Sequence, residues 1–500
     1  MEHFLTLMTF LPLLGALVVL VLPRGNANLV RWTALVSTLP GLLLGVWLFQ
    51  HFDRSVATMQ LVERHAWIPA FNVQYLMGVD GLSVSMLLLT VLLSPLCILA
   101  SWGIEKGVKG YFALFLLLET GMIGVFSALD FFLFFIFWEL MLLPMYFLIG
   151  IWGGPRREYA AIKFFLYTLI GSVLMLIAML ALYFANTPHT FDMMVLMEKA
   201  PTYSHGFQAW AWIALFIGFA IKIPAFPFHT WLPDAHVEAP TAISVILAGV
   251  LLKMGTYGIL RVCFPVFPLA TQEYAFWALG VLGCWNIVYG ALCAMAQKDM
   301  KSLVAYSSIS HMGYVMLGMA TLTPEGMNGA VLQMFNHGTV TAMLFLLVGV
   351  IYDRAHHRNI DGFGGLASVM PIYTGFVTIA FFAALGLPGF SAFISEVLVL
   401  LGTWQYSKPL AIIAASAVVL TAGYMLWMLQ RVWLGPVNEK YAGLPDMNWR
   451  EIVTLVPLTV IVIVLGVYPH AVLDLFGPTL VALGDTVSSA VPAAAQAVLR

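Results

Sequence analysis

Residues 217–260 of the chain read IGFAIKIPAFPFHTWLPDAHVEAPTAISVILAGVLLKMGTYGIL. Lys222 and Lys253 lie among apolar residues in this stretch, and Pro224 and Pro227 closely follow Lys222. Because proline lacks a backbone N–H, a helix through Lys222 must be interrupted just after it. An interruption inside a membrane is tolerated only where protein or water satisfies the freed backbone groups. The stretch therefore predicts a hydrated cavity beside Lys222, in which a proton can be released, and a following helix that carries Lys253.

The composition excludes an ordinary soluble enzyme. The 500 residues are 61% hydrophobic and 9% charged, whereas about 25% of residues are charged in an average soluble domain. The formal net charge is −2, and no cluster of Lys and Arg offers the electrostatic footprint that nucleic acid requires. No C-x-x-C spacing suggests a zinc or iron–sulfur site. We interpret the cysteines as small apolar side chains: Cys97, Cys263, Cys284 and Cys293.

Long apolar segments predict an all-α polytopic membrane protein. A crossing helix needs about 20 mostly apolar residues, and the chain offers about fourteen such segments. Most connections are short, so residues 1–500 are expected to form a single membrane domain. The first segment lacks the basic region and cleavage site of a signal peptide and is expected to be retained. The predicted spans are 4–22, 29–50, 79–101, 111–129, 131–150, 161–184, 210–231, 240–263, 275–296, 302–322, 328–352, 371–402, 409–434 and 451–471.

The basic residues predict the orientation of the chain. Cytoplasmic loops carry an excess of Lys and Arg, and one side of the predicted topology holds fourteen of them against six on the other. This distribution places both termini on the outer side of the membrane. Two of the 22 basic residues, Lys222 and Lys253, belong to neither side because they fall well inside predicted spans. The inner set is Arg24, Arg31, Lys106, Lys109, Arg156, Arg157, Lys163, Lys298, Lys301, Arg354, Arg358, Arg431, Lys440 and Arg450, and the outer set is Arg54, Arg64, Lys199, Arg261, Lys408 and Arg500.

Seven ionisable residues fall well inside predicted spans. A charged side chain at the centre of a membrane helix costs about 3 kcal/mol on insertion scales, so function is the default interpretation. Structural pairing between helices is the alternative, and a neutral hydrogen-bonding role is an equal alternative for Glu119. For His311 and His337 a proton relay and a satisfied core histidine are both open. The seven are Glu119, Glu139, Lys222, Lys253, His311, His337 and Glu396.

A second interruption predicts an internal repeat. Gly386, Pro388 and Gly389 break the twelfth span ahead of Glu396, as the prolines break the seventh span after Lys222. Because the two broken spans are five positions apart in the series of spans, an odd number, their directions are inverted, which suggests two inverted five-helix repeats. The predicted divisions are helices 1–3 in residues 1–105, the first repeat in 106–265, the second in 271–435, and helix 14 with a C-terminal tail in 451–500.

Two further patterns are weak. Gly362, Gly364 and Ala367 fit the dinucleotide-binding pattern G-x-G-x-x-A, but they follow an apolar helix and leave no room for a βαβ unit. His229 and His236 are separated by a proline and are too loosely spaced to predict a metal site. We therefore expect this chain to bind neither a nucleotide nor a metal.

Four segments together resemble a known family. They are WELMLLPMYFLIGIWG at 138–153, IKIPAFPFHTWLPDAHVEAPTAISVILAGVLLKMGTYGILR at 221–261, KSLVAYSSISHMGYVMLG at 301–318 and GLPGFSAFISE at 386–396. They look like the antiporter-like, proton-conducting membrane subunits of respiratory complex I, the NADH-quinone oxidoreductase. The resemblance covers most of the chain, roughly residues 75–435. Subunits of multisubunit sodium/proton antiporters and of membrane-bound hydrogenases share the lysine-bearing and histidine-bearing segments.

The resemblance implies a role for each buried group. In the family, the glutamate matching Glu139 pairs with the lysine matching Lys222 and tunes it. A proton then passes through the positions of Lys253 and His311 to an exit group, here Glu396. Most relatives carry lysine at the exit position, so the glutamate favours a complex I subunit over the antiporter relatives. The secondary candidates are His337 and Glu119.

The resemblance also implies partners. NADH, FMN, iron–sulfur clusters and quinone would be handled by other subunits, so no cofactor is expected in this chain. The expected partners are the other complex I membrane subunits, including two further antiporter-like subunits, the lipid bilayer and, indirectly, the peripheral redox arm. Moving one charge against 100 mV costs about 2.3 kcal/mol, so pumping would need redox energy from those subunits. The expected location is the bacterial inner (plasma) membrane.

Three alternatives stay open. The chain could be a subunit of a multisubunit Na⁺/H⁺ antiporter or of a membrane-bound hydrogenase. It could also be a scaffold that pumps nothing, in which the buried charges only pair helices. An independent solute transporter is the third alternative, but the sequence holds no signature of a dedicated substrate pocket.

Overall fold

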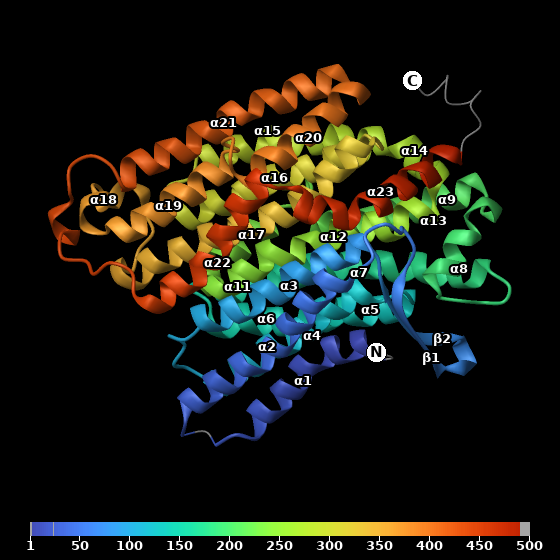
Figure 1. The fold of residues 1–500 in the computed structure, drawn as a ribbon, viewed down its shortest axis with the longest axis horizontal. Coiled ribbons are helices and arrows are strands. Elements are labelled where there is room, and N and C mark those ends of the chain that lie inside the picture. The colour runs from blue at the N-terminus through green and yellow to red at the C-terminus, as the bar shows by residue number, and fades with distance from the viewer. Residues whose placement is uncertain (1–2, 24, 491–500) are drawn as a thin grey trace.

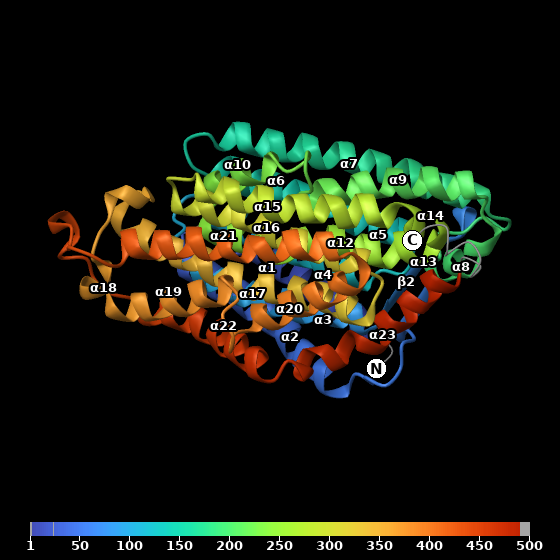
Figure 2. The same cartoon turned by 90° about the horizontal axis from the view of Figure 1, so that it is seen from above.

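Long helices packed side by side dominate the computed structural model, which describes residues 3–23 and 25–490. They run roughly along the longest axis of the molecule (Figure 1), and a view turned by 90° shows the same alignment (Figure 2). This arrangement confirms the predicted helical membrane class. Three features of the sequence predictions lie outside the described residues: Arg24, Arg500 and the tail beyond residue 490.

A two-stranded antiparallel hairpin interrupts the helical series near the N-terminus. The sequence predicts no strand there, so the all-helical prediction is wrong for this connection. The hairpin's Glu63 is buried, and its carboxylate accepts hydrogen bonds from the backbone N–H groups of Leu5 (2.6 Å) and Thr6 (3.2 Å). It thereby satisfies donors that the start of a helix leaves unpaired. The elements are α1 (Phe4–Val21), α2 (Ala27–His51), β1 (Gln60–Ile68), η1 (Pro69–Phe71), β2 (Val73–Val79) and α3 (Gly81–Ala100).

The seventh span breaks directly after Lys222, as predicted. The first helix of that span ends at this lysine. The fifth span is also broken, which the sequence analysis does not predict. Its first helix ends at Leu140, and Pro144 has no N–H to donate to the carbonyl of that residue. The elements are α4 (Val108–Ser127), α5 (Phe131–Leu140), α6 (Leu142–Trp152), α7 (Arg157–Ala185), α8 (Met193–Glu198), η2 (Ala200–Thr202), α9 (His205–Lys222) and α10 (Trp231–Glu238).

The eighth and ninth spans contain π-helical turns, one of which ends two residues before Lys253. Single π-helical turns inside α-helices are frequent at functional sites. The eighth span consists of α11 (Thr241–Ile246), η3 (Leu247–Leu251), α12 (Leu252–Gly258), η4 (Ile259–Cys263) and α13 (Phe264–Val266). The ninth consists of α14 (Pro268–Tyr274), η5 (Ala275–Val281) and α15 (Leu282–Met295).

The twelfth span breaks between Ala384 and Ser391, as predicted. The last long helix follows the fourteenth predicted span and packs against α3 and α17. The elements are α16 (Met300–Ala320), α17 (Pro324–Ala355), η6 (Ile360–Gly362), α18 (Leu366–Val369), α19 (Pro371–Ala384), α20 (Ser391–Tyr406), α21 (Lys408–Val432), η7 (Glu439–Tyr441), α22 (Trp449–Val467) and α23 (His470–Ser489).

Twelve helices within the described part of the chain are long and apolar enough to cross a membrane. They include α23, which the sequence analysis leaves in a C-terminal tail, but not α9, α16 or the two pieces of the twelfth span. The total of about fourteen spans, the two inverted repeats and the predicted domain boundaries therefore remain predictions.

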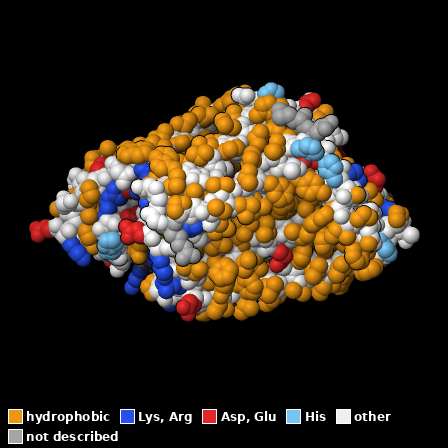
Figure 3. Space-filling model, turned by 90° about the horizontal axis from the view of Figure 1, so that it is seen from below, with side chains coloured by type: hydrophobic (Ala, Val, Ile, Leu, Met, Phe, Trp, Pro, Cys, Tyr) orange, Lys and Arg blue, Asp and Glu red, His pale blue; other side chains and the backbone are white. Residues whose placement is uncertain are grey.

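One end of the molecule carries many of its charged side chains. Figure 3 shows Lys, Arg, Asp and Glu side chains gathered there, beside a largely hydrophobic surface. Ion pairs join loops that the predicted topology places together on the inner side. They are Arg156–Asp234 (3.7 Å), Arg358–Asp299 (3.0 Å) and Arg431–Asp361 (2.7 Å).

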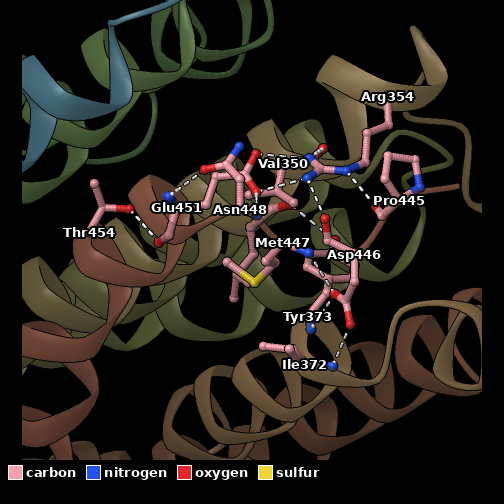
Figure 4. A network of polar contacts seen from close by, with 11 residues as sticks. Val350, Arg354, Ile372, Tyr373, Pro445, Asp446, Met447, Asn448, Glu451 and Thr454 are labelled. Carbon is pink, nitrogen blue, oxygen red and sulfur yellow. Dashed lines mark hydrogen bonds and ion pairs between the residues drawn. The ribbon is translucent and has the colours of Figure 1, made fainter.

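At the same end, Arg354 of α17 fixes the loop that leads into α22 (Figure 4). Its guanidinium donates to both carboxylate oxygens of Glu451, at 2.9 and 2.8 Å, and to the carbonyl of Asp446. The carboxylate of Asp446 accepts from two backbone N–H groups at the start of α19. Asn448 and Glu451 form a capping box at the start of α22. This network sets the position of the N-terminal end of α22.

Arg261 is buried, although the predicted topology places it on the outer side. Its guanidinium, on η4, donates to the two carboxylate oxygens of Asp80 at 2.7 and 2.6 Å, and the two side chains are 5% and 3% exposed. Lys301 is buried as well, and its ammonium donates to the carbonyl of Ala239. Lys222 and Lys253 are therefore not the only buried basic residues among those that the structure describes. The bidentate carboxylate partner is what allows a guanidinium to be buried at this position.

Arg261→Met is expected to lower the stability of the chain by about 3–5 kcal/mol, because Asp80 would keep a buried charge without its partner. Thermal unfolding of the purified protein assembly should show this as a lower midpoint. The double variant Asp80→Asn/Arg261→Met removes both charges and keeps a side-chain oxygen for the start of α3, so it should recover most of the loss. A double variant no more stable than Arg261→Met would contradict this explanation.

Candidate functional site

Lys253 lies at the start of a chain of polar contacts in the middle of the molecule. It is fully buried on α12. Its Nζ donates to the carbonyl of Ala248 in η3 at 2.5 Å and lies 2.6 Å from Nδ1 of His337 on α17. Gly249, on the same face, lets α3 and α17 approach, because a Cβ there would lie 2.6 Å from Leu93. The lack of a side chain at Gly249 thus makes room for the neighbouring helices beside Lys253.

The contacts continue from His337 to the twelfth span. The ring centroids of His337 and His311, on α16, are 5.9 Å apart. His311 Nδ1 is 3.2 Å from Oε1 of Glu396 on α20. We call Lys253, His337, His311 and Glu396 the central chain. All four residues are at most 6% exposed, so their ionisable groups are shielded from bulk solvent.

A set of uncharged polar side chains orients the central chain. The Nε2 of Gln333 lies 3.4 Å from His311 Nδ1, and its Oε1 accepts a hydrogen bond from Ser395 Oγ at 2.5 Å. The Nδ2 of Asn336 donates to Ser395 Oγ at 3.1 Å and to the carbonyl of Ser391 at 2.7 Å. In the sequence, Gln333 stands out because it lies four residues before His337, on the same face of a helix. The sequence gives no comparable signal for Asn336 or Ser395.

The break in the twelfth span makes room for Glu396. Gly386, which follows α19, has φ +71, a left-handed conformation that favours glycine. A Cβ added to Gly386 would lie 2.7 Å from Oε2 of Glu396. The glycine therefore permits both the turn and the close approach of the carboxylate to the backbone.

Lys222 lies next to two aromatic rings at the end of α9, apart from the central chain. It is 2% exposed, and its Nζ lies 5.2 Å from the ring centroid of Trp138 and 5.6 Å from that of Phe164. Cation–π attraction is strengthened where the cation is desolvated. Trp138 is held in place because its Nε1 donates to Ser172 at 3.2 Å. The aromatic rings thus stabilise a charge beside the break in the seventh span.

Glu139 lies next to Trp138 on α5, beside the break in the fifth span. Its side chain is partly exposed on the isolated chain, while its Oε1 is buried and has no hydrogen-bond partner among the described residues. Glu139 acts electrostatically on Lys222, but within the described part of the chain the two form no ion pair closer than 4.0 Å. The predicted pair is therefore near enough to interact without direct contact.

Glu119 lies apart from these groups, on α4. It is fully buried, and neither carboxylate oxygen has a hydrogen-bond partner among residues 3–23 and 25–490. A Cβ added to Gly41 of α2 would lie 3.8 Å from its Oε1, and it acts electrostatically on Cys97 of α3. Glu119 thus faces α2 and α3, and no direct contact connects it to the central chain.

His236, on α10, is a candidate that the sequence analysis considers only as a metal ligand. It is fully buried and stacks on Phe345 with a centroid distance of 4.6 Å. Neither ring nitrogen has a hydrogen-bond partner in the described part of the chain. Lys253 and Lys301 both act electrostatically on it. Its position between two buried lysines is a signal that only the three-dimensional structure supplies.

A cavity of about 670 Å³ opens at the charged end of the molecule next to Lys301. Glu238 and Arg358 also line it. Charged walls and a buried lysine at its inner boundary make this cavity a place where water can reach the interior. Lys301, which lines the cavity, and Lys253 both act electrostatically on His236.

The weak patterns of the sequence form no second site. His229 Nε2 lies 3.0 Å from the hydroxyl of Tyr289, and the residues that the structure describes include no group of three or more His, Cys, Asp or Glu able to hold a metal. Gly362 ends η6 and Gly364 lies in the loop before α18. No strand leads directly into these glycines, because the only strands in the described chain, β1 and β2, lie near the N-terminus.

Two family models match the chain. One, described as "NADH:quinone oxidoreductase/Mrp antiporter, TM", covers residues 128–421, and the other, described as "NADH-ubiquinone oxidoreductase chain 4, amino terminus", covers residues 32–126. The chain belongs to the NADH:quinone oxidoreductase/Mrp antiporter family. The central chain, Lys222 and Glu139 all lie within the segment that matches the first family model.

Individual members of the family are similar along nearly their whole length. The chain is 46% identical over 495 residues to the NADH-quinone oxidoreductase subunit M of Rhodobacter capsulatus, which covers 96% of each protein. It matches a chain of respiratory complex I from Thermus thermophilus with a TM-score of 0.89 and 29% identity, over 97% of this chain and 99% of that one. A chain of the Mrp complex from a Dietzia species matches with a TM-score of 0.86 over 100% and 99% of the two chains. At 23% identity, this last similarity shows a shared fold alone.

Proposed function

We propose that this chain is a proton-translocating membrane subunit of NADH:quinone oxidoreductase, as its relatives named subunit M are subunits of that enzyme. It moves protons through buried Glu, Lys and His side chains, driven by electron transfer from NADH to quinone in other subunits. The observation that carries the proposal is the central chain, which connects Lys253 on α12 to Glu396 on α20 through two histidines.

The proton route begins at the cavity of the charged end. A proton enters beside Lys301, passes His236 and reaches Lys253, and from there it moves through the central chain to Glu396. Proton transfer requires partners within about 2.6–3.2 Å or one bridging water. The contact of Lys253 with His337 at 2.6 Å meets this condition directly. The two histidine rings, with centroids 5.9 Å apart, would exchange a proton through one bridging water.

Lys222 and Glu139 control this route in the proposal. The positive charge of Lys222 sets the electrostatic potential along the neighbouring α12, which packs against α9 through Gly255 and Gly258. Glu139 is partly exposed on the isolated chain, so a neighbouring subunit could change its surroundings. A signal from that subunit would then reach Lys222 without any movement of the central chain.

The partners in the proposal are the other membrane subunits of complex I, including two further antiporter-like subunits. NADH, FMN, iron–sulfur clusters and quinone belong to partner subunits, and this chain contributes none of them. The charged end of the molecule faces the cytoplasm of a bacterium, and both termini lie on the outer side of its inner membrane, because basic residues favour the cytoplasmic side.

Purification of the complete assembly tests the proposal. We expect flavin-containing and iron–sulfur-containing subunits to copurify with this chain, and NADH oxidation to acidify the lumen of inverted membrane vesicles. Glu396→Gln should reduce that acidification by about a hundredfold or more, the lower range of the effect of losing one positioned acid–base group. Full pumping in a Glu396→Gln assembly would show instead that Glu396 is not part of the route.

A subunit of a sodium/proton antiporter is the second candidate, because the matching family model includes Mrp antiporters. Sodium-dependent proton exchange without NADH oxidation, in vesicles that hold the purified assembly, would favour it. Membranes that pump with NADH and show no sodium-driven exchange would favour the complex I subunit.

A further inference from the structure

A cavity of about 410 Å³ lies between the N-terminal ends of α2 and α22, apart from the central chain. Trp32 of α2, Trp102 after α3 and Trp449 of α22 line it, together with Arg450. The rings of Trp32 and Trp102 meet edge to face with centroids 5.0 Å apart. Tryptophan is enriched where the hydrocarbon of a bilayer meets water. The cavity therefore lies at the level of the lipid headgroups, at the charged end of the molecule.

Exposed apolar side chains extend from this cavity along the helices. On α2 and on α22 they recur about every three or four residues, and Trp32 and Trp449 are the members of the two series that line the cavity. Between these two helices, α3 is buried except for Leu88, Leu92 and its last two residues. The stripe on α2 ends at Val46, which is about 21 Å from Trp32 at 1.5 Å per residue. That length exceeds half of a hydrocarbon core of about 30 Å, so the stripe is long enough for an acyl chain.

The polar groups at the cavity favour an anion. Arg450 forms no hydrogen bond or ion pair within the described part of the chain. Its guanidinium acts electrostatically on Asp353 but is not paired with that carboxylate. The neighbouring carboxylate of Glu451 forms an ion pair with Arg354 rather than with Arg450. Arg31 donates to Asn28, which lines the cavity. The N-terminal ends of α2 and α22 add partial positive charge.

We infer that this cavity binds the headgroup of one anionic phospholipid, whose acyl chains lie along the exposed stripes of α2 and α22. A helix of a partner subunit would cover the apolar stripes equally well but would leave the guanidinium of Arg450 without an anion. A phosphodiester matches Arg450 through charge-assisted hydrogen bonds, and the tryptophans fit the glycerol region beside it. The inference does not depend on the proposed route of protons.

Lipid retention by the complete assembly tests the inference. The purified assembly is equilibrated with vesicles of phosphatidylglycerol and phosphatidylcholine in equal amounts, isolated again, and its bound lipids are counted by mass spectrometry. We expect a preference for phosphatidylglycerol that Arg450→Gln weakens by about tenfold, as for the loss of a charge-assisted hydrogen bond. Asn28→Asp changes an exposed residue and places an acid beside Arg31, so it should weaken the same preference even if Arg450→Gln fails to assemble.

The matched control is Arg431→Gln, which removes an arginine of the same end that pairs with Asp361 and is 49% exposed. It should retain phosphatidylglycerol as the unmodified assembly does. Inorganic phosphate at millimolar concentration should not displace the lipid, because it lacks acyl chains. The inference is overturned if Arg450→Gln and Asn28→Asp both retain the lipid unchanged, if Arg431→Gln loses it equally, or if phosphate alone displaces it.

Discussion

Lys253→Met is expected to stop NADH-driven proton pumping in a fully assembled complex. The ammonium of Lys253 is the group that joins His337 to the path from the charged end, and the thioether of methionine holds no proton. We expect the initial rate of vesicle acidification to fall by about a hundredfold or more. Native electrophoresis of the same membranes checks that the assembly is intact.

Lys253→Arg separates charge from proton transfer. A guanidinium keeps the positive charge but does not release its proton in proteins, so this variant should fail as completely as Lys253→Met. Lys408→Met is the matched control, because Lys408 is exposed at the start of α21 and its Nζ lies 5.7 Å from the ring centroid of Trp404. Normal pumping by Lys253→Arg would show that this position supplies only charge.

The predicted breaks in the fold follow from local chemistry, whereas the missed features are either concealed within a long apolar run or depend on contacts between distant residues. Pro224 and Pro227 remove backbone donors, and Gly386 adopts a left-handed conformation, so both interruptions are visible in the sequence. The break after Leu140 lies in an apolar run long enough to read as one span, which conceals the effect of Pro144. The hairpin between α2 and α3 depends on contacts with the start of α1, which no local pattern encodes.

The members of the site could be predicted, whereas most of their contacts could not. Ionisable side chains are rare inside membrane helices, so Lys253 and Glu396 stand out from the sequence alone. The contact between Lys253 and His337 joins positions 84 residues apart, and its existence depends on how helices pack. His236 is concealed by its surroundings, since the prolines and acidic residues around it resemble a loop at the membrane surface.

The burial of Arg261 could not be predicted from the sequence for the same reason, because it depends on how helices pack. Counting charges places Arg261 outside because the predicted eighth span ends at residue 263. In the structure that span continues to Val266, and Arg261 turns inward to Asp80 of α3. A buried arginine and a surface arginine look alike in the sequence until the partner carboxylate, 181 residues away, is known.

Lys222→Ala is expected to have the second large effect, a loss of pumping of about tenfold or more through the coupling of Lys222 to its neighbours. In the unmodified protein, the ammonium of Lys222 lies beside Trp138 and Phe164, with Nζ 5.2 and 5.6 Å from their ring centroids. Because the proposal assigns Lys222 an electrostatic role, Lys222→Arg should keep a substantial part of the pumping rate. This contrasts with Lys253→Arg, which should keep none, and equal failure of the two arginine variants would contradict the distinction.

Glu139→Gln should lower pumping to a similar extent, because it removes the negative charge that acts on Lys222. If the two residues act as a unit, the double variant Glu139→Gln/Lys222→Ala should be no worse than the poorer single variant, since coupled residues give non-additive effects. The control is Glu119→Gln, which changes a buried glutamate on α4 that faces α2 and α3, away from Lys222. Additive losses in the double variant would mean that Glu139 and Lys222 act independently, in which case a partner subunit would have no route through Glu139 to the proton path.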